Sequence, residues 1–196
     1  MARDRVLLLD AYGVLFADPM RPLFEVVGAD AARSATAVAA IFEYEFRQPL
    51  YSGDLPEPEF WPLLASRCGI EPAAARWRRV LRRAAAPLPA LFWLPALADE
   101  VDVWLLVNHR HEWFEPALRD CGADRYVART LVSSRTGLVQ PQPAAYRRVR
   151  RLAGERAAVF VGGAPAHVAG ARAAGLPARL ADARATWATE ARLDGR

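Results

Sequence analysis

Three short apolar runs constrain the fold of this chain most. They span residues 5–10, 101–107 and 157–162, and helical patterns follow the last two at 112–121 and 165–174. A glycine comes directly after each of these helical patterns, as is usual just past a helix end. Continuous apolar strands that alternate with helices predict an α/β fold, with a Rossmann-like parallel sheet flanked by helices. Shorter strands are expected at 126–133 and 176–180, and ligands are expected beyond the carboxyl ends of the strands.

The long segment between the first two apolar runs shows almost no strand character. Helices are expected there at 20–48, 57–68, 72–86 and 89–99. A chain of 196 residues suits one well-buried core and a modest insertion. We therefore predict a core domain of residues 1–16 and 87–196, with a small all-helical cap of residues 17–86 inserted after the first strand.

Charge and hydropathy exclude several classes of partner. The net charge of +4 comes from arginines, whose runs at 76–83 and 147–151 fall in expected helices and indicate solvated faces. No alternation of aromatic and basic residues accompanies them, so no nucleic-acid partner is expected. The longest apolar stretch, 84–98, contains three prolines, so no membrane span is expected. Two widely separated cysteines, and only four apolar residues after Arg5, favour a cytoplasmic location.

Two segments resemble motifs of the haloacid dehalogenase (HAD) superfamily. Val6-Leu-Leu-Leu-Asp-Ala-Tyr-Gly-Val-Leu15 is similar to an apolar strand that ends in D-x-D-G-x-L. The run from Gly162 to Gly175 is similar to G-D-x-x-x-D-x-x-G-A-x-x-A-G. The likeness extends from Val6 to about Leu180 and includes a cap turn at residues 52–55. It implies a HAD-like fold of the helical-cap branch, near the sugar-phosphate-phosphatase-like and epoxide-hydrolase-N-domain-like members.

The chain departs from this resemblance at the residues that carry the chemistry. In the superfamily the two carboxylates of the first motif act as nucleophile and general acid, and here they correspond to Asp10 and Tyr12. A Ser or Thr that holds the phosphoryl group is replaced by Val107, which precedes Asn108. The Lys that balances negative charge is replaced by the neutral amide of Gln140. The chain therefore resembles a degenerate member of the superfamily.

The acidic pair that binds Mg²⁺ in the superfamily is also missing. Gly163 and His167 stand at its two positions. Mg²⁺ requires hard oxygen ligands, and Asp10 alone would remain as a carboxylate in the expected cage. We predict that the Mg²⁺ site is lost, that no cofactor is bound, and that ordinary phosphatase or dehalogenase activity is absent.

The altered pocket still contains residues that could do chemistry. The three histidines of the chain, His109, His111 and His167, are all expected to border it. One interpretation is that they are ordinary helix-start and surface residues. The other is that one of them acts as a base or contacts an anion, because an unperturbed histidine titrates near neutral pH. Asp10 is either catalytic or an acceptor for the turn after it. The Gly162-Gly163 turn and the helix that follows it would attract an anion. Candidate catalytic residues are Asp10, His167 and His109; candidate substrate-binding residues are Tyr12, Asn108, Arg110, Gln140, Gly162 and Gly163; no metal ligand is predicted.

Two functional hypotheses remain open. The first, which we favour at this stage, is a non-catalytic subunit or partner of a hetero-oligomeric enzyme, in bacterial specialised metabolism, or a homo-oligomer. Its interface would use the apolar residues 91–94 and 113–114. The second is a repurposed metal-independent enzyme that performs elimination, cyclisation or hydration on an anionic small molecule; a residual HAD hydrolase is a third alternative. In the cap, the residues proposed to face the site are Tyr44, Glu45, Arg47, Tyr51, Phe60 and Trp61.

Overall fold

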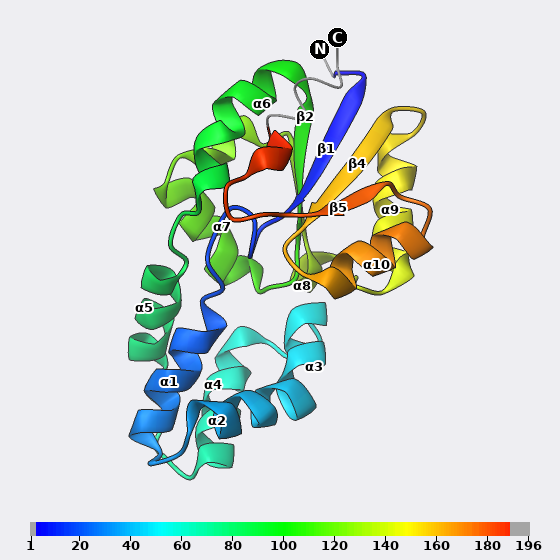
Figure 1. Cartoon of the computed structure of the whole chain (residues 1–196). Helices are drawn as coiled ribbons and strands as arrows, with labels where there is room; N and C mark the ends of the chain where they lie inside the picture. The colour runs from blue at the N-terminus through cyan, green and yellow to red at the C-terminus, as the bar shows by residue number, and fades with distance from the viewer. Residues whose placement is uncertain (1–2, 189–196) are drawn as a thin grey trace.

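A parallel sheet forms the centre of the protein. The computed structural model describes residues 3–188, and within them five parallel strands lie in the order β3-β2-β1-β4-β5 (Figure 1). The strands are β1 (Arg5–Asp10), β2 (Asp102–Val107), β3 (Arg129–Val132), β4 (Ala157–Gly162) and β5 (Ala178–Leu180).

Both faces of the sheet are covered by helices, which confirms the predicted fold class. Leu7 and Leu9 of β1 pack in the cluster that includes α6 and α7, while Val6 and Leu8 pack in the cluster with α9 and α10. Strands buried on both faces account for the continuous apolar runs. No helix within residues 3–188 is long and apolar enough to cross a membrane. The core helices are α6 (Leu94–Glu100), α7 (His111–Asp120), α8 (Ser133–Thr136), α9 (Pro143–Ala153) and α10 (Pro165–Ala173), with short 3₁₀ turns η2 (Pro89–Trp93) and η3 (Ala123–Tyr126).

An all-helical insertion separates β1 from the rest of the core. It lies beyond the carboxyl ends of the strands (Figure 1) and has its own core around Phe42, Phe60, Trp61 and Trp77. The two chain segments that connect it to the core run side by side: the Ala17 N–H donates to the Ala86 carbonyl at 2.8 Å. The insertion contains α1 (Met20–Asp30), α2 (Ala35–Ile41), the π-helical turn η1 (Phe42–Phe46), α3 (Arg47–Ser52), α4 (Glu57–Cys68) and α5 (Ala74–Ala84).

Several predicted elements have different limits in the structure. The single helix expected at 20–48 is wrong, because the chain turns after Asp30: Ala32 has a positive φ of 50°, and the Ser34 hydroxyl starts a new helix by accepting the Ala37 N–H at 3.1 Å. The expected helix at 89–99 is split, with α6 beginning at Leu94 next to Pro95. Strands β3 and β5 are shorter than predicted.

Buried polar contacts hold the insertion against the core. Arg110, at the start of α7, donates to the carbonyls of Leu50 and Leu55 in the insertion, at 3.3 and 3.1 Å. Trp113 of α7 donates its indole N–H at 3.0 Å to Glu57, a buried residue of α4. The loss of a partner by a buried polar group lowers the stability of the folded protein. These contacts therefore hold the insertion against the carboxyl ends of the strands.

Candidate functional site

Asp10 and His167 form a close pair at the carboxyl end of the sheet. Asp10 is the last residue of β1, and His167 lies in the first turn of α10, which follows β4, the neighbour of β1. The His167 Nδ1 atom is 2.5 Å from the Asp10 Oδ2 atom. The Asp10 side chain is 5% exposed and the His167 side chain 15%. The carboxylate is therefore nearly enclosed, while the imidazole keeps one edge accessible.

Gln140 occupies the other side of the Asp10 carboxylate. Its side-chain amide is fully buried and donates to Asp10 Oδ1 at 3.4 Å and to the Leu106 carbonyl at 3.2 Å. The Tyr146 hydroxyl lies 2.8 Å from the His167 carbonyl and 3.3 Å from Gln140 Oε1. Burial, with the nearby Asp10 carboxylate, raises the pKa of Tyr146 and keeps its phenol protonated. Gln140 thus contacts Asp10, and it lies outside the lining of the cavity in which it was expected to bind substrate.

Asn108 fixes the loop that carries Gln140. The Asn108 amide donates to the Gln140 carbonyl at 2.8 Å and accepts the Gln140 N–H at 2.8 Å. Asn108 also lines the cavity. Asn108 therefore lines the cavity, and its amide also makes two hydrogen bonds to the backbone of the loop that carries Gln140.

The backbones of Gly13 and Gly163 touch, which leaves no space for a side chain at position 163. Gly13 has a φ of +79°, and a Cβ added to Gly163 would overlap the Tyr12 carbonyl oxygen and lie 2.9 Å from the Gly13 Cα. The Gly163 N–H lies 3.4 Å from Asp10 Oδ2, which thus occupies the predicted anion position at this turn. Gly162 faces Phe160 and Val168 instead of the cavity, so its predicted substrate contact is not supported.

The residues present do not fit a Mg²⁺ ion. Mg²⁺ requires near-octahedral oxygen ligands. Asp10 is already paired with His167 and Gln140, and no side chain fits at Gly163. Within residues 3–188 no group of three or more His, Cys, Asp or Glu side chains is placed to hold a metal.

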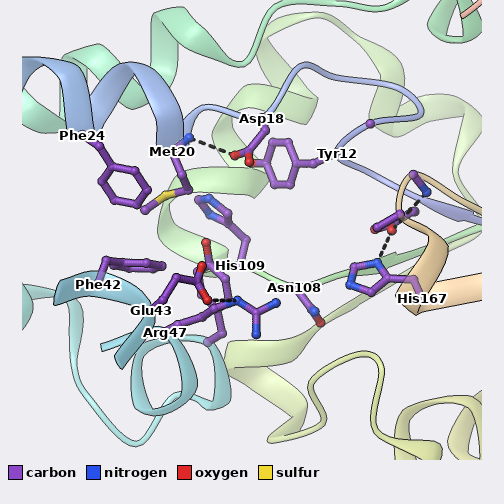
Figure 2. Close-up of a pocket in the computed structure, with 15 residues that line it drawn as sticks. Tyr12, Asp18, Met20, Phe24, Phe42, Glu43, Arg47, Asn108, His109 and His167 are labelled. Atoms are coloured by element: carbon purple, nitrogen blue, oxygen red, sulfur yellow. Dashed lines mark hydrogen bonds and ion pairs between the residues drawn. The ribbon is translucent and has the colours of Figure 1, made fainter. Parts of the chain in front are cut away.

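A cavity of about 330 Å³ lies between the Asp10–His167 pair and the insertion (Figure 2). The far edge of the His167 ring is turned toward Asn108 (Figure 2). Tyr12 also lines the cavity, and burial, assisted by Asp18, raises the pKa of its phenol, so Tyr12 is neutral. The lining residues are Asp10, Tyr12, Gly13, Asp18, Met20, Phe24, Phe42, Glu43, Arg47, Tyr51, Asn108, His109, Gly163, Ala164 and His167.

His109 is a neutral part of the cavity wall. It is 1% exposed, and its ring centroid lies 4.8 Å from that of Tyr12, 5.5 Å from Tyr51 and 5.2 Å from Trp113. Neither ring nitrogen has a hydrogen-bond partner among the described residues. Burial lowers the pKa of His109 to about 3. The prediction that His109 acts as a base is therefore not supported, since the removal of water makes its ring a poor proton acceptor at neutral pH.

Arg110 and His111 point away from the cavity. Arg110 is buried and pairs with Glu112, with its Nη2 atom 2.5 Å from a carboxylate oxygen. Arg110 therefore lies outside the lining of the cavity, and its guanidinium is engaged by Glu112 and by the insertion. His111 contacts the Ser134 hydroxyl at 3.1 Å and does not line the cavity.

The insertion contributes a set of lining residues that differs from the predicted one. Of the six insertion residues proposed from the sequence, Arg47 and Tyr51 line the cavity. Tyr44 is 92% exposed, and Phe60 and Trp61 are in the core of the insertion. Sequence reasoning missed Asp18 and Glu43. The available signals were modest: Asp18 lies two residues before the first residue of α1, and Glu43 is spaced i,i+4 from Arg47.

Comparisons with known proteins identify the fold. No family model and no curated protein matches the chain. Among solved structures, the HAD-family enzyme bt-2542 from Bacteroides thetaiotaomicron has a TM-score of 0.79 at 16% identity, over 97% of this chain and 98% of that one. A predicted HAD-like hydrolase from Porphyromonas gingivalis has a TM-score of 0.77 at 18% identity, over 98% of both chains.

A third similar structure is a dehalogenase. L-2-haloacid dehalogenase from Xanthobacter autotrophicus, with chloropropionic acid covalently bound, has a TM-score of 0.63 at 17% identity, over 92% of this chain and 78% of that one. The bt-2542 enzyme has also been solved in complex with magnesium and inorganic phosphate. At these identities the likeness establishes the fold, which is HAD-like.

Proposed function

We propose that this HAD-like chain is a metal-independent enzyme that performs general acid–base catalysis on a small molecule, with His167 as the group that transfers the proton. The observation that carries the proposal is the 2.5 Å contact between His167 Nδ1 and Asp10 Oδ2 at the wall of the cavity. A carboxylate at Nδ1 fixes the tautomer of an imidazole, leaves Nε2 free to accept a proton, and stabilises the imidazolium that forms.

The surroundings of Asp10 suit a positioning role better than nucleophilic attack. Its Oδ2 atom contacts His167 and the Gly163 N–H, and its Oδ1 atom contacts Gln140. Attack on a substrate would require one oxygen to leave these partners. In the acid–base role both oxygens keep them, while Nε2 takes a proton from a C–H or O–H group of the substrate. Eliminations, cyclisations and hydrations all contain such a step.

The solved structures with a similar fold favour an enzyme, but this chain differs from a magnesium-dependent one in its site. The similar solved structures are described as enzymes or hydrolases, and bt-2542 forms a complex with magnesium and phosphate. In this chain the backbone contact between Gly13 and Gly163 leaves no space for a second carboxylate at that position. We therefore propose a reaction that needs a proton acceptor but no metal.

The partner-protein hypothesis has less support from the described surface. Leu94, Trp113 and Phe114, three of the residues suggested for an interface, are buried in the cores of the protein. Phe92 alone of that set is largely exposed, at 79%. One exposed ring in that set offers little apolar area for an interface, so we place the enzyme first.

The test is turnover without metal. The purified protein, in buffer containing EDTA, would be incubated with a panel of small β-hydroxy and amino carbonyl compounds in D₂O, and mass spectrometry would detect deuterium uptake or product. We expect turnover that falls about 100-fold or more in His167→Gln, the usual range for removal of a general base. His111→Gln is the matched control and should retain activity, because His111 lies outside the cavity.

Two results would overturn the proposal. One is turnover that depends on added Mg²⁺ or is unchanged in His167→Gln. The other is a covalent substrate adduct on Asp10, detected by intact-mass and peptide analysis, because it would establish nucleophilic catalysis in place of proton transfer.

A further inference from the structure

The insertion side of the cavity carries an excess of negative charge. Asp18 and Glu43 line it there, and Asp10 lines the opposite side. The guanidinium of Arg47 is the only one among the described lining residues, and it is already 3.4 Å from Glu43. His167 adds at most one positive charge beside Asp10. The lining therefore stays net negative in either form of His167, which opposes the anionic ligand expected from the sequence.

Aromatic rings line the cavity together with these carboxylates. Phe24, Phe42 and Tyr51 belong to this lining, and the Phe42 ring centroid lies 5.2 Å from that of Phe24 and 5.7 Å from that of Tyr51. Aromatic faces attract cations, and Arg47 already lies 5.8 Å from the centroid of the Tyr51 ring. Carboxylates and aromatic faces together are suited to a positively charged group.

His109 supplies an independent sign that a ligand belongs here. Its ring is 1% exposed, it lines the cavity, and neither ring nitrogen has a partner among the described residues. Buried polar groups normally have hydrogen-bond partners. His109 shares the lining of this cavity with Asp18 and Glu43 (Figure 2). A neutral imidazole offers one acceptor nitrogen, which suits an N–H donor from a ligand.

We infer that the substrate carries a protonated primary amine, held by Asp18, Glu43 and the surrounding aromatic rings, with one N–H donated to His109. This inference rests on the proposed function, because it names the substrate class of the same cavity. The ammonium would bind on the insertion side, and the reacting carbon or oxygen would then lie toward His167 on the opposite side. A quaternary ammonium would satisfy the carboxylates and rings but could not donate to His109.

The test compares ligands that share a phenethyl group and differ in the charge of the attached polar group. Isothermal titration calorimetry at low salt would measure the affinities of phenethylammonium, its neutral counterpart hydrocinnamamide and its anionic counterpart hydrocinnamate. We expect phenethylammonium to bind most tightly and to weaken as salt screens the carboxylates, while the neutral amide is insensitive to salt. Phenethyltrimethylammonium should bind more weakly than the primary amine.

Matched variants identify the groups responsible. Asp18→Asn with Glu43→Gln retains side-chain size and should weaken phenethylammonium binding about fivefold, the loss expected when two exposed carboxylates no longer pair with the ammonium. The control Glu59→Gln removes an exposed carboxylate of the insertion that does not line the cavity, and it should have no effect. His109→Phe keeps an aromatic ring and should abolish the preference for the primary over the quaternary amine.

The outcomes separate this inference from the proposed function. If hydrocinnamate or the neutral amide binds as tightly as phenethylammonium, or if the double variant binds the amine normally, the inference fails, even where His167→Gln still abolishes turnover. If the amine binds through Asp18 and Glu43 while His167→Gln leaves turnover unchanged, the proposed function fails and the inference stands.

Discussion

The buried, neutral His109 predicts a specific dependence of stability on pH. Burial lowers the pKa of His109 in the folded protein from its ordinary value of 6.5 to about 3. Between these two values the unfolded chain binds a proton that the folded chain does not, so the free energy of unfolding rises with pH across this window and levels off above pH 6.5. The slope reaches about 1.4 kcal/mol per pH unit. From pH 7.5 to pH 5 the loss attributable to His109 is about 2 kcal/mol.

The assay is urea unfolding followed by tryptophan fluorescence at pH 7.5, 6.5, 5.5 and 5.0, on the wild type and on His109→Phe. The variant keeps an aromatic ring beside Tyr12 and Trp113 but has no group that titrates. The window lies above the range in which carboxylates titrate, so their contribution is small there. The measured quantity is the difference between the two pH profiles, with the m-value checked for a constant unfolding transition.

The control is His111→Gln, which removes a different, partly exposed histidine near the same helix start. It should leave the wild-type slope in place. Parallel profiles for the wild type and His109→Phe would refute the reasoning, since they would mean that His109 takes up its proton in the folded protein as readily as in the unfolded chain.

Three further predictions concern packing and buried polar contacts. Gly163→Ala should destabilise the protein by about 1–3 kcal/mol in urea unfolding, because the new methyl group would overlap the Tyr12 carbonyl; an unchanged midpoint would contradict the close backbone contact. Glu57→Gln should cost about 2 kcal/mol in the same assay, because Arg78 donates two hydrogen bonds to this buried carboxylate; a loss no larger than in Glu59→Gln would count against it. Arg110→Met should speed limited proteolysis at the linkers to the insertion, since two contacts to the insertion are removed; equal cleavage rates would show that other contacts hold it.

The sheet and the central pair of the site could be predicted because both follow from local patterns. Buried parallel strands are continuous apolar runs, and the ends of β1 and β4 must lie side by side once their order is known. This placed Asp10, Gly163 and His167 together. The break after Asp30 was harder to see, because the backbone turn at Ala32 has no glycine or proline to mark it.

The insertion side of the cavity could not be predicted, because its placement depends on contacts between distant segments. Asp18 and Glu43 each have an ordinary local explanation, as the acceptor for the Met20 N–H and as the partner of Arg47. Asp18 and Glu43 line one cavity only because the insertion packs against the carboxyl ends of the strands. The orientation of the Arg110 side chain could not be predicted for the same reason. Arg110 follows two lining residues, Asn108 and His109, but its guanidinium binds the carbonyls of Leu50 and Leu55, which are distant in the sequence.

The contact between Gly13 and Gly163 also limits the evolutionary routes open to this chain. An aspartate at position 163 is one substitution away in sequence, but its Cβ has no space until the loop at Tyr12 and Gly13 moves. Metal-dependent chemistry at this position would therefore need a change in the first loop before the acid could be accepted, and a variant with that change alone would gain no ligand. Selection can adjust the lining of this cavity one residue at a time, whereas a magnesium site that uses position 163 requires at least two coordinated steps.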